Sequence, residues 1–525
     1  MGIPSPRLLA AGIAAGTLML GATTGFAQDN AATRQQIQLL KQQMQQMQQQ
    51  IENLQMAETR AEEKANAAAQ AARQAQAAAP PRNAPRVTET ASHRFGLSSA
   101  DGANSIALTG RLNVDTADYL NYNPMPGMKD KHLASGINLR RARIGVTGTF
   151  MNDWNYALIY DFGGNSDSLN NNNAFANGNA GSPFSGNTAL SGVENALITY
   201  NGFYDHGQKF PVAIDFGVMD VPWTLQEATS SNDILFMERS SAQVVAAAYG
   251  GGDSRTAFGA RSNNDRYFAA AYFTGPNSGA LHTDGATCVG AAAPCVALPS
   301  GHGPQTSFLA RGSYQVFQNE DFSLHLGADF ADLFRPRGAS NAETITLADR
   351  PELRVDPSQL ISSGAIPSTR GMVFGGEAAA QWHNAFIEGE YFHYSVDQVL
   401  GKPTLEFNGG YVEASYTFGG RRRYSPASGG YTGVIPDHSL SMGEGGGWGA
   451  LELAARYSVV DLNDLTTIGG KQTVYSVGLN YYPNLNMKFM LDFEHGDIYI
   501  PTVIGGPNTK GATLNAIAAR TQIMF

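Results

Sequence analysis

The segment LRRARIGVTGTF, residues 139–150, contains Arg141 and Arg143, whose spacing is suited to binding anions. In an extended strand successive side chains point to opposite faces, so Arg141 and Arg143 share one face. The other face is apolar and carries Ala142, Ile144, Val146 and Phe150. Two guanidinium groups at successive positions of one face offer fixed positive charge to an anion. The strand alone does not decide whether its polar face meets solvent outside a soluble sandwich or water inside a membrane barrel.

Residue patterns for catalysis or metal binding are weaker than this arginine pair. The ten histidines are scattered along the chain. No Ser/His/acid arrangement, glycine-rich phosphate loop or metal-spaced His/Cys set is legible in the sequence. We therefore expect no enzyme, no cofactor and no metal site.

The composition argues against a helical membrane protein and against a nucleic-acid partner. The 525 residues are 42% hydrophobic and only 15% charged, with 59 glycines and a mean hydropathy of -0.23. No internal segment reaches the run of about 18 apolar residues that a membrane-spanning helix needs. Transmembrane β-strands escape this test, because only every second residue must be apolar. The formal net charge of -10 makes nucleic acid an unsuitable partner.

Residues 1–27 have the three parts of a secretory signal peptide. Arg7 supplies the positive region, LLAAGIAAGTLML the apolar core and GFA the small-residue cleavage site before Gln28. A retained membrane anchor is the alternative, and the short apolar run argues against it. In an exported chain, the two cysteines, Cys288 and Cys295, are expected to form a disulfide that pins one loop tip.

Residues 28–79 carry a heptad pattern. Large apolar residues recur at alternating spacings of three and four: Ile37, Leu40, Met44, Met47, Ile51 and Leu54. This spacing predicts the a/d seam of an α-helical coiled coil, with an alanine-rich continuation in the same register. Disordered glutamine-rich sequence is the alternative. Pro80, Pro81 and Pro85 end the helical pattern, so residues 80–103 are interpreted as a linker.

From residue 104 to 525 the apolar pattern changes to period two. We predict about 16 antiparallel strands, joined alternately by short turns such as MND and NED and by long connections such as 163–191 and 332–370. The connection 420–446 is the exception, because it is long where a short turn is due. Sorted connections of this kind are typical of bacterial outer-membrane barrels. The predicted fold is an all-β membrane barrel preceded by an N-terminal coiled coil.

The C-terminal segment AIAARTQIMF supports this fold. Its apolar residues alternate with Arg520 and Gln522, and the chain ends on Phe525 inside the amphipathic strand. Such an end is similar to those of outer-membrane proteins, which their assembly machinery recognises. In a barrel of this kind, Arg141 and Arg143 face a water-filled interior, because lipid leaves charged side chains no other place.

Several stretches resemble the phosphate-selective porin family, the porins O and P. GRLNVDTADY is similar to its first strand, RRARIGVTGTFMNDWNYALIYDFGG to its second hairpin and EATSSNDILFMERS to its inward-folded third loop, and WGALELAARYS is also shared. The resemblance covers nearly all of residues 104–525. It implies a homotrimer in the lipid of the outer membrane of a Gram-negative bacterium. It also implies passive uptake of small hydrophilic solutes, including anions such as phosphate. Many relatives also carry an N-terminal coiled-coil extension.

The period-two pattern predicts a mixed interior charge. Eight arginines are the pore-lining or anion-binding candidates: Arg111, Arg141, Arg143, Arg239, Arg255, Arg261, Arg311 and Arg456. Arg520 and Lys488 share the inward parity. So do eleven acids: Asp115, Asp161, Asp215, Asp329, Glu377, Glu388, Glu390, Glu413, Glu452, Asp492 and Glu494. Phosphate specificity is therefore not carried over from the family.

Arg141 and Arg143 are the leading candidates for the permeation path. Arg239 is the one cation of the expected constriction loop, residues 219–254, and is expected to face this pair across the pore. For each inward arginine the alternative is a cross-strand ion pair that stiffens the barrel wall.

Two functional hypotheses follow. The first is an outer-membrane porin for passive diffusion. The second is a structural protein that tethers the envelope, with its coiled coil in the periplasm contacting the cell wall. Deleting residues 28–79 separates the two, because a channel keeps its conductance whereas a tether loses its effect on envelope stability.

Overall fold

The chain divides into two compact units, Met1–Arg82 and Asn83–Phe525, which are described separately. The computed structural model describes residues 30–78, 84–90, 94–123, 133–163, 192–203, 211–252, 254–277, 288–289, 296–297, 305–337, 343–441, 446–501 and 511–525. The predicted signal peptide, residues 1–27, lies outside these ranges.

The N-terminal unit contains one long helix, α1 (Asn30–Ala78), rich in alanine and glutamine. Its 49 residues make it about 73 Å long at about 1.5 Å per residue. In the single chain, all six seam residues are exposed, from 51% for Ile37 to 69% for Leu54. The helix is present as expected, and its coiled-coil pairing stays a prediction. In the described part of the chain, no helix is both long and apolar enough to span a membrane.

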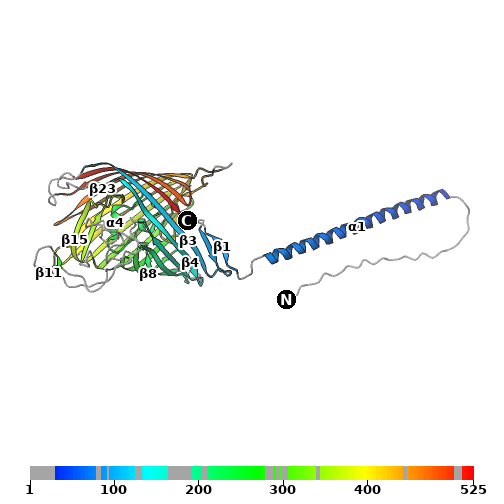
Figure 1. The fold of residues 1–525 in the computed structure, drawn as a ribbon, viewed down its shortest axis with the longest axis horizontal. Helices are drawn as coiled ribbons and strands as arrows, with labels where there is room; N and C mark the ends of the chain where they lie inside the picture. Colours follow the sequence, from blue (N-terminus) through cyan, green and yellow to red (C-terminus); the bar gives the residue numbers. More distant parts are fainter. Residues whose placement is uncertain are drawn as a thin grey trace. The chain divides into compact units, whose positions relative to one another are not determined.

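The second unit is a closed antiparallel barrel (Figure 1). Sixteen strands of the described chain form it in sequence order: β3 (Ser105–Asn123), β4 (Gly136–Phe150), β5 (Trp154–Asp161), β6 (Val193–Tyr200), β7 (Val212–Met219), β8 (Arg255–Asn263), β9 (Tyr267–Asn277), β12 (Thr306–Gln318), β13 (Phe322–Arg335), β15 (Ile361–Trp382), β16 (Ala385–Gln398), β17 (Leu405–Phe418), β22 (Ala450–Asp464), β23 (Thr467–Asn484), β24 (Met487–Tyr499) and β25 (Ala512–Met524). The last strand pairs with the first, with Arg520 opposite Asp115. The predicted all-β barrel is confirmed.

The two faces of the wall differ as the alternating pattern requires. On β22, Leu453 and Tyr457 point outward and are 49% and 42% exposed, whereas Glu452 and Arg456 point inward and are buried. Aromatic side chains gather at one rim, where Trp154 lies 5.8 Å from Phe150 and 4.8 Å from Tyr200 between ring centroids. Such a rim is typical of the aromatic girdle of a membrane barrel.

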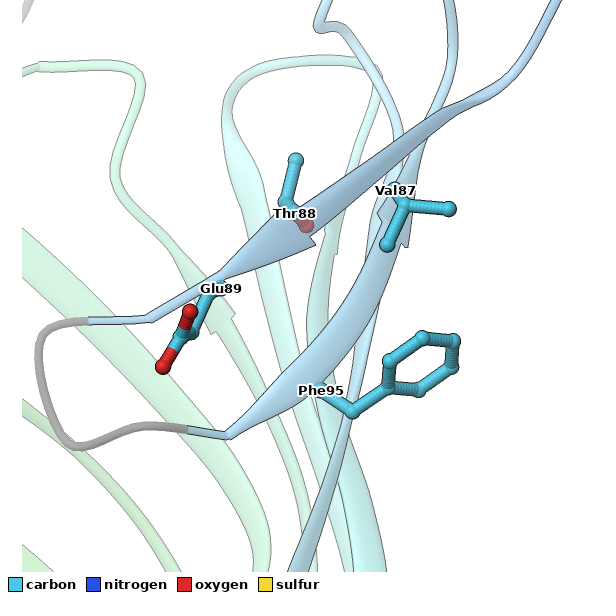
Figure 2. A pocket seen from close by; sticks show the side chains of 4 residues that line it. All are labelled: Val87, Thr88, Glu89 and Phe95. Atoms are coloured by element: carbon cyan, nitrogen blue, oxygen red, sulfur yellow. The ribbon is translucent and has the colours of Figure 1, made fainter.

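A short hairpin precedes the barrel, within the segment that the sequence assigns to a linker. It consists of β1 (Arg86–Glu89) and β2 (Phe95–Ser98). Strand β2 pairs with β3 at Ser105–Ala107, just beyond the point where the last residue, Phe525, hydrogen-bonds to Gly110. Val87 and Phe95 line a pocket on this hairpin and point to the same side of it (Figure 2).

Three connections fold into the barrel interior. The first, residues 220–254, is called the constriction loop and contains α3 (Leu225–Ala228) and α4 (Ser241–Ala247). The second is residues 343–360, with β14 (Thr344–Asp349). The third is the inner turn, residues 419–437, with β18 (Gly420–Arg421), β19 (Tyr424–Ser425), β20 (Gly430–Tyr431) and β21 (Ile435–Pro436). The inner turn lies in the connection between β17 and β22. The sequence analysis singles out this connection because it is long where a short turn is due.

Part of the interior is packed with apolar side chains. Val245 of α4, Leu347 of β14 and Phe392 of the wall are fully buried in one cluster. The sequence predicts a water-filled interior around Arg141 and Arg143 and gives no sign of this apolar packing. Inward positions such as Phe392 carry large apolar residues because they are buried in this cluster, which is favourable.

Candidate functional site: the constriction

Acidic side chains of the wall hold one end of the constriction loop. The backbone N–H groups of Leu225 and Gln226 donate to Glu390 at 2.6 and 3.0 Å, and that of Thr224 donates to Asp329 at 3.2 Å. These amides belong to the first turn of α3 and have no partner within the helix. Inward acids of β13 and β16 therefore fix where the loop enters the lumen.

Basic side chains of the wall hold the middle of the loop. Lys488 donates to the carbonyl of Ile234 at 2.7 Å, and Arg456 donates to the carbonyl of Glu238 at 2.9 Å. Arg456 also pairs with the carboxylate of Glu352 at 2.6 Å and lies over the ring of Phe236. Arg456, one of the sequence-predicted candidates, is thus buried as a loop fastener.

Arg143 and Arg111 lie directly opposite each other on β4 and β3. Arg143 donates to Asp161 at 2.8 Å and also pairs with Glu194. Arg111 donates to the hydroxyl of Ser231 in the constriction loop at 2.8 Å, and it is half-buried. Arg143 therefore forms the wall ion pair that is the alternative role for each inward arginine. Arg111 instead reaches the narrow part of the lumen.

The sequence reasoning missed Arg140. The alternation places it on the lipid face, yet it is fully buried inside the barrel next to Arg141. The pairing of β4 with β3 skips one residue here, since Asn113 faces Arg141 and Val114 faces Leu139. This β-bulge turns Arg140 inward. A charged residue at a lipid-facing position is the signal that indicates such a bulge.

Glu238 of the constriction loop meets this cluster. Arg140 donates to both of its carboxylate oxygens, at 2.8 and 3.1 Å, and Arg520 donates to one of them at 2.8 Å. Arg354 of the second connection lies at 3.3 Å. Burial alone would raise the pKa of Glu238, but these guanidinium groups together with Arg141 hold it well below its usual value.

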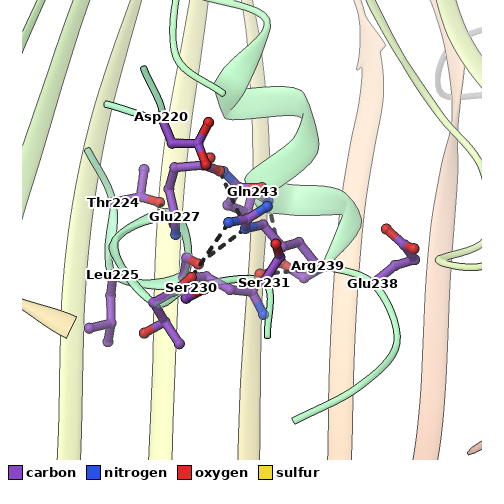
Figure 3. A network of polar contacts seen from close by, with 12 residues as sticks. Asp220, Thr224, Leu225, Glu227, Ser230, Ser231, Glu238, Arg239 and Gln243 are labelled. Atoms are coloured by element: carbon purple, nitrogen blue, oxygen red, sulfur yellow. Dashed lines mark hydrogen bonds and ion pairs between the residues drawn. The ribbon is translucent and has the colours of Figure 1, made fainter. Parts of the chain in front are cut away.

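Arg239 turns the other way. Its Nε donates to the carbonyl of Gln226 at 3.1 Å and lies 3.4 Å from Glu227, which keeps it inside the loop (Figure 3). Glu238 points away from that network in the same view. The expectation that Arg239 faces Arg141 is wrong, because an adjacent residue with the opposite charge occupies that position.

The remaining candidate arginines fasten the inward connections. Arg311 pairs with Glu377 through two bonds of 3.0 Å and donates to the carbonyl of Gly429 at 2.7 Å. Arg261 donates to Asp215 at 2.9 Å and to the carbonyl of Ala427 at 3.0 Å. These two arginines hold the inner turn by donating to its backbone carbonyls. The period-two strand pattern does not predict that this turn lies near them.

Arg255 fastens the exit of the constriction loop instead. It donates to the carbonyl of Gly251 at 2.8 Å and to the side chain of Gln305 at 3.3 Å. The structure thus brings the candidates together only in groups, each next to one of the inward connections.

Arg422 of the inner turn is a second interior cation that the sequence reasoning missed. It forms two bonds to Glu452, at 2.7 and 2.8 Å, and is buried. It also donates to the backbone carbonyl of Asp233 in the constriction loop. No period-two signal marks Arg422, because it lies outside the sixteen strands. The inner turn and the constriction loop are therefore joined inside the barrel.

Three buried carboxylates come close enough together to hold a cation. One oxygen each from Asp329, Glu377 and Glu390 lies within 4.8 Å of the others. Arg311 and His325 already donate to Glu377, and loop amides donate to Asp329 and Glu390. These contacts make the cluster an anchor for the constriction loop.

The predicted disulfide falls outside the described residues, since Cys295 is not among them. Cys288 lies in the two-residue strand β10 (Cys288–Val289), which pairs with β11 (Val296–Ala297). The disulfide stays a prediction.

A closed barrel with a lipid-facing apolar surface and a charged interior narrowed by an inward loop defines the class of outer-membrane channel barrels. Within that class, the chain belongs to the phosphate-selective porin O and P family, whose model matches residues 106–525. The members of this family are channels rather than enzymes.

Two curated proteins share parts of the sequence. An uncharacterized protein of Caulobacter vibrioides is 31% identical over 206 residues, which cover 38% of this chain and 39% of that protein. Porin O of Pseudomonas aeruginosa is 28% identical over 152 residues, which cover 29% of this chain and 28% of that protein. The chain thus matches less than half the length of either relative.

Solved porins share the architecture at low identity. The trimer form of OmpT from Vibrio cholerae has a TM-score of 0.44 at 11% identity, covering 81% of this chain and 100% of that one. An anion-selective porin from Comamonas acidovorans has a TM-score of 0.44 at 12% identity, covering 80% and 100%. Neither likeness carries an argument about this protein, whose fold is established by its own strand pairing.

Proposed function

We propose that this protein is an outer-membrane porin through which small hydrophilic solutes, including anions such as phosphate, diffuse passively. The observation that carries the proposal is the constriction loop, which enters a closed membrane barrel and is held on several sides by charged wall residues. A loop held in this way narrows the lumen. Solutes then cross along charged side chains rather than through lipid.

The preference among ions is set by the arginines around the constriction. Of the eight candidates, Arg111 and Arg261 are half-buried, whereas the other six are buried. Arg111 stands opposite a second arginine and donates to the constriction loop. Like charges directly opposite each other on a sheet repel, so an anion near Arg111 relieves this repulsion. We therefore assign the anion preference that we propose for the pore to Arg111.

Planar-bilayer recordings of the purified protein in a KCl gradient test this proposal. We expect wild-type channels to conduct, and Arg111→Glu to move the zero-current potential toward cation selectivity. Arg266→Glu, in an exposed turn, is the control with the same charge change. A protein that forms no channel would refute the porin function. An unchanged potential in Arg111→Glu, with conductance intact, would place ion selection elsewhere.

We further propose that the barrels form a homotrimer and that α1 forms a parallel coiled coil in the periplasm. The six exposed seam residues of α1 support this arrangement, since a lone helix gains nothing from an apolar seam in water. The even number of barrel strands also supports the periplasmic position of α1. An even number of strands returns the chain to the side on which it entered, so α1 and Phe525 share the periplasmic side.

A second function is favoured by the length of α1. A helix of about 73 Å can extend from the membrane toward the cell wall as a spacer. Deleting residues 28–79 is expected to leave conductance unchanged and to weaken the cell envelope against detergent. Envelope stability equal to that of the wild type would exclude the tether.

A further inference from the structure

The outward face of the barrel becomes polar at the end away from Phe525. Strands β16, β17, β22 and β23 place four outward residues directly opposite one another in a single row: His393, Asn408, Asp461 and Lys471. Nearer to Phe525, the outward positions of the same strands are apolar and exposed, such as Ile387 on β16 and Val412 on β17. Polar side chains are costly in contact with acyl chains, so the row marks one limit of the hydrocarbon region.

The position of this row agrees with the height of a membrane. Ala385 begins β16 next to a short turn, and eight residue steps separate it from His393. At about 3.4 Å per step and a tilt of about 40°, these steps rise about 20 Å. The apolar band of such barrels is about 25 Å tall, so His393 lies near its edge. The row therefore faces lipid headgroups.

Side chains at this row form the first of two similar clusters. Tyr391 donates its hydroxyl to Oδ1 of Asn408 at 2.7 Å, and Nδ1 of His393 lies 3.0 Å from the same oxygen. Because an amide oxygen only accepts, Nδ1 of His393 carries the proton. In the described part of the chain, no hydrogen bond uses Nδ2 of Asn408 or Nε2 of His393. One donor and one acceptor therefore remain for a ligand.

A second cluster repeats this arrangement on β23, β24 and β25. Nδ1 of His495 lies 2.7 Å from Oδ1 of Asn515, the residue directly opposite it, and Nε2 lies 3.4 Å from Asp497. Tyr475 is opposite His495 on the other side, with the two rings 6.2 Å apart. The ring of Tyr457 follows at 5.3 Å from that of Tyr475. Each cluster thus combines a tyrosine, a histidine and an asparagine on the outward face.

This composition suits a sugar better than an acyl chain or a simple anion. Every sugar hydroxyl both donates and accepts, and the asparagine and histidine groups offer both roles at neighbouring positions. Tyrosine rings supply flat apolar surfaces with a polar hydroxyl at the edge, which suits a membrane interface. The charges are mixed, because Lys471 lies 3.8 Å from the carboxylate of Asp461. A ligand recognised by net charge alone therefore gains little here.

We propose that the two Tyr–His–Asn clusters bind the sugar headgroup of lipopolysaccharide, the glycolipid in the outer leaflet of the outer membrane. This site goes beyond the diffusion function and rests on the proposed orientation, which turns this end of the barrel toward the cell exterior. Glycolipid bound there contacts the outward faces of the strands without entering the lumen. The clusters thereby fix the height of the barrel in the outer leaflet.

Binding of fluorescent lipopolysaccharide with a short sugar core, measured on the full-length protein in detergent, tests the proposal. Refolding from inclusion bodies avoids co-purified bacterial lipid. The quadruple variant removes the polar groups of both clusters: His393→Ala, Asn408→Ala, His495→Ala and Asn515→Ala. We expect it to bind about tenfold or more weakly, since several hydrogen bonds to one ligand are lost. Wild-type affinity in the folded quadruple variant would overturn the proposal.

Two controls make the test specific. Phosphatidic acid is anionic and carries no sugar, so its binding should be equal in the wild type and the quadruple variant. His438→Ala with Asn155→Ala removes the same residue types at exposed positions of the opposite end of the barrel, and should leave lipopolysaccharide binding unchanged. An equal loss for both lipids, or an equal loss in this control variant, would refute sugar recognition by the clusters.

Further outcomes separate a lipid surface from a contact between copies of the chain. If the clusters lie between protomers, the quadruple variant lowers the melting temperature of the refolded oligomer before any lipid is added, and this result would also refute the proposal. A wild-type protein that binds lipopolysaccharide without conducting refutes the porin function and leaves the clusters standing.

Heat-modifiable gel mobility shows whether each variant is folded. If the quadruple variant is not, His495→Ala with Asn515→Ala replaces it. The expected loss is then about threefold or more, because one cluster remains. An unchanged affinity in this folded double variant would again refute the proposal.

Discussion

Arg456 shows how the interior charges of this barrel are used. Its guanidinium group holds the carbonyl of Glu238, pairs with Glu352 and lies 3.5 Å from Glu413, all of them buried. A buried charge is stable only when its partners are in place, and removing one partner leaves the others uncompensated. Single residues of the wall therefore determine whether the constriction loop stays in position.

Replacing Arg456 by methionine is expected to destabilise the protein by about 3–5 kcal/mol, because buried Glu352 and Glu413 lose their partner. Arg370→Met is the matched control, since the Arg370–Asp332 pair is exposed and such pairs contribute about 0–1 kcal/mol. Urea unfolding in detergent, followed by the fluorescence of the buried Trp223 in the constriction loop, measures the difference. Equal effects of the two substitutions would contradict the fastener role of Arg456.

Ionisation of the buried residue Asp349 is expected to make the stability of the protein depend on pH. Burial raises the pKa of Asp349 to about 6. Because the folded-state pKa is above the unfolded value, the protonated group favours folding at low pH, and this contribution is lost as pH rises to about 6. Asp349→Asn mimics the protonated form. We expect it to melt at a higher temperature than the wild type at pH 7.5 and at the same temperature at pH 4. A pH-independent difference would show that ionisation of Asp349 is not the cause.

The elements of the barrel were largely predictable, and the inward connections were not. Alternation over residues 104–525 indicates all sixteen strands, because lipid and lumen impose opposite polarities on successive side chains. The alternation assigns Arg140 to the lipid face, which is wrong. A β-bulge changes the face to which a side chain points without changing the residue composition of the strand. The alternation also gives no warning that the inner turn enters the lumen. The contacts of Arg422 with Glu452 and Asp233 join segments far apart in sequence, and short-range pattern carries no information about them.

Shortening the inner turn is expected to increase single-channel conductance. Gly420 pairs with Pro436, so an Asn-Gly turn can replace the intervening residues without moving the adjoining strands. The change removes the carbonyls of Ala427 and Gly429 from Arg261 and Arg311 and clears their part of the lumen. Shortening the connection 399–404, which is not one of the inward connections, is the control. Conductance that does not rise would mean that the inner turn lies outside the permeation path.

The whole molecule joins a membrane barrel to a helix of different composition. We expect polar replacement of Ile37, Leu40, Ile51 and Leu54 to lower the melting temperature of the oligomer by several degrees, since each removes a seam contact. Membrane insertion should persist, because the barrel forms its own hydrogen bonds. Semi-native gel electrophoresis at increasing temperature measures the effect. An isolated 28–79 peptide that stays unfolded and monomeric at high concentration would contradict the coiled coil.

The orientation of the molecule can be tested by labelling intact cells. A cysteine at Leu400, in the connection between β16 and β17, should react with an impermeant reagent in a variant lacking Cys288 and Cys295. A cysteine at Ala84 should not react, since the proposed orientation places it on the periplasmic side. The reverse pattern of labelling would overturn the proposed orientation.

The hairpin of β1 and β2 bears on how the cylinder closes. Strand β2 occupies the edge of β3 at Ser105–Ala107, and β25 occupies the same edge from Arg111 onward. The ring of Phe525 lies over Gly110, where a Cβ atom would come within 2.3 Å of it. Because β2 fills this edge at Ser105–Ala107, strand β25 ends where Phe525 pairs with Gly110. Strand β25 cannot shift along β3 by two residues toward the hairpin. The hairpin therefore fixes the register between β25 and β3, the strand pair that closes the barrel.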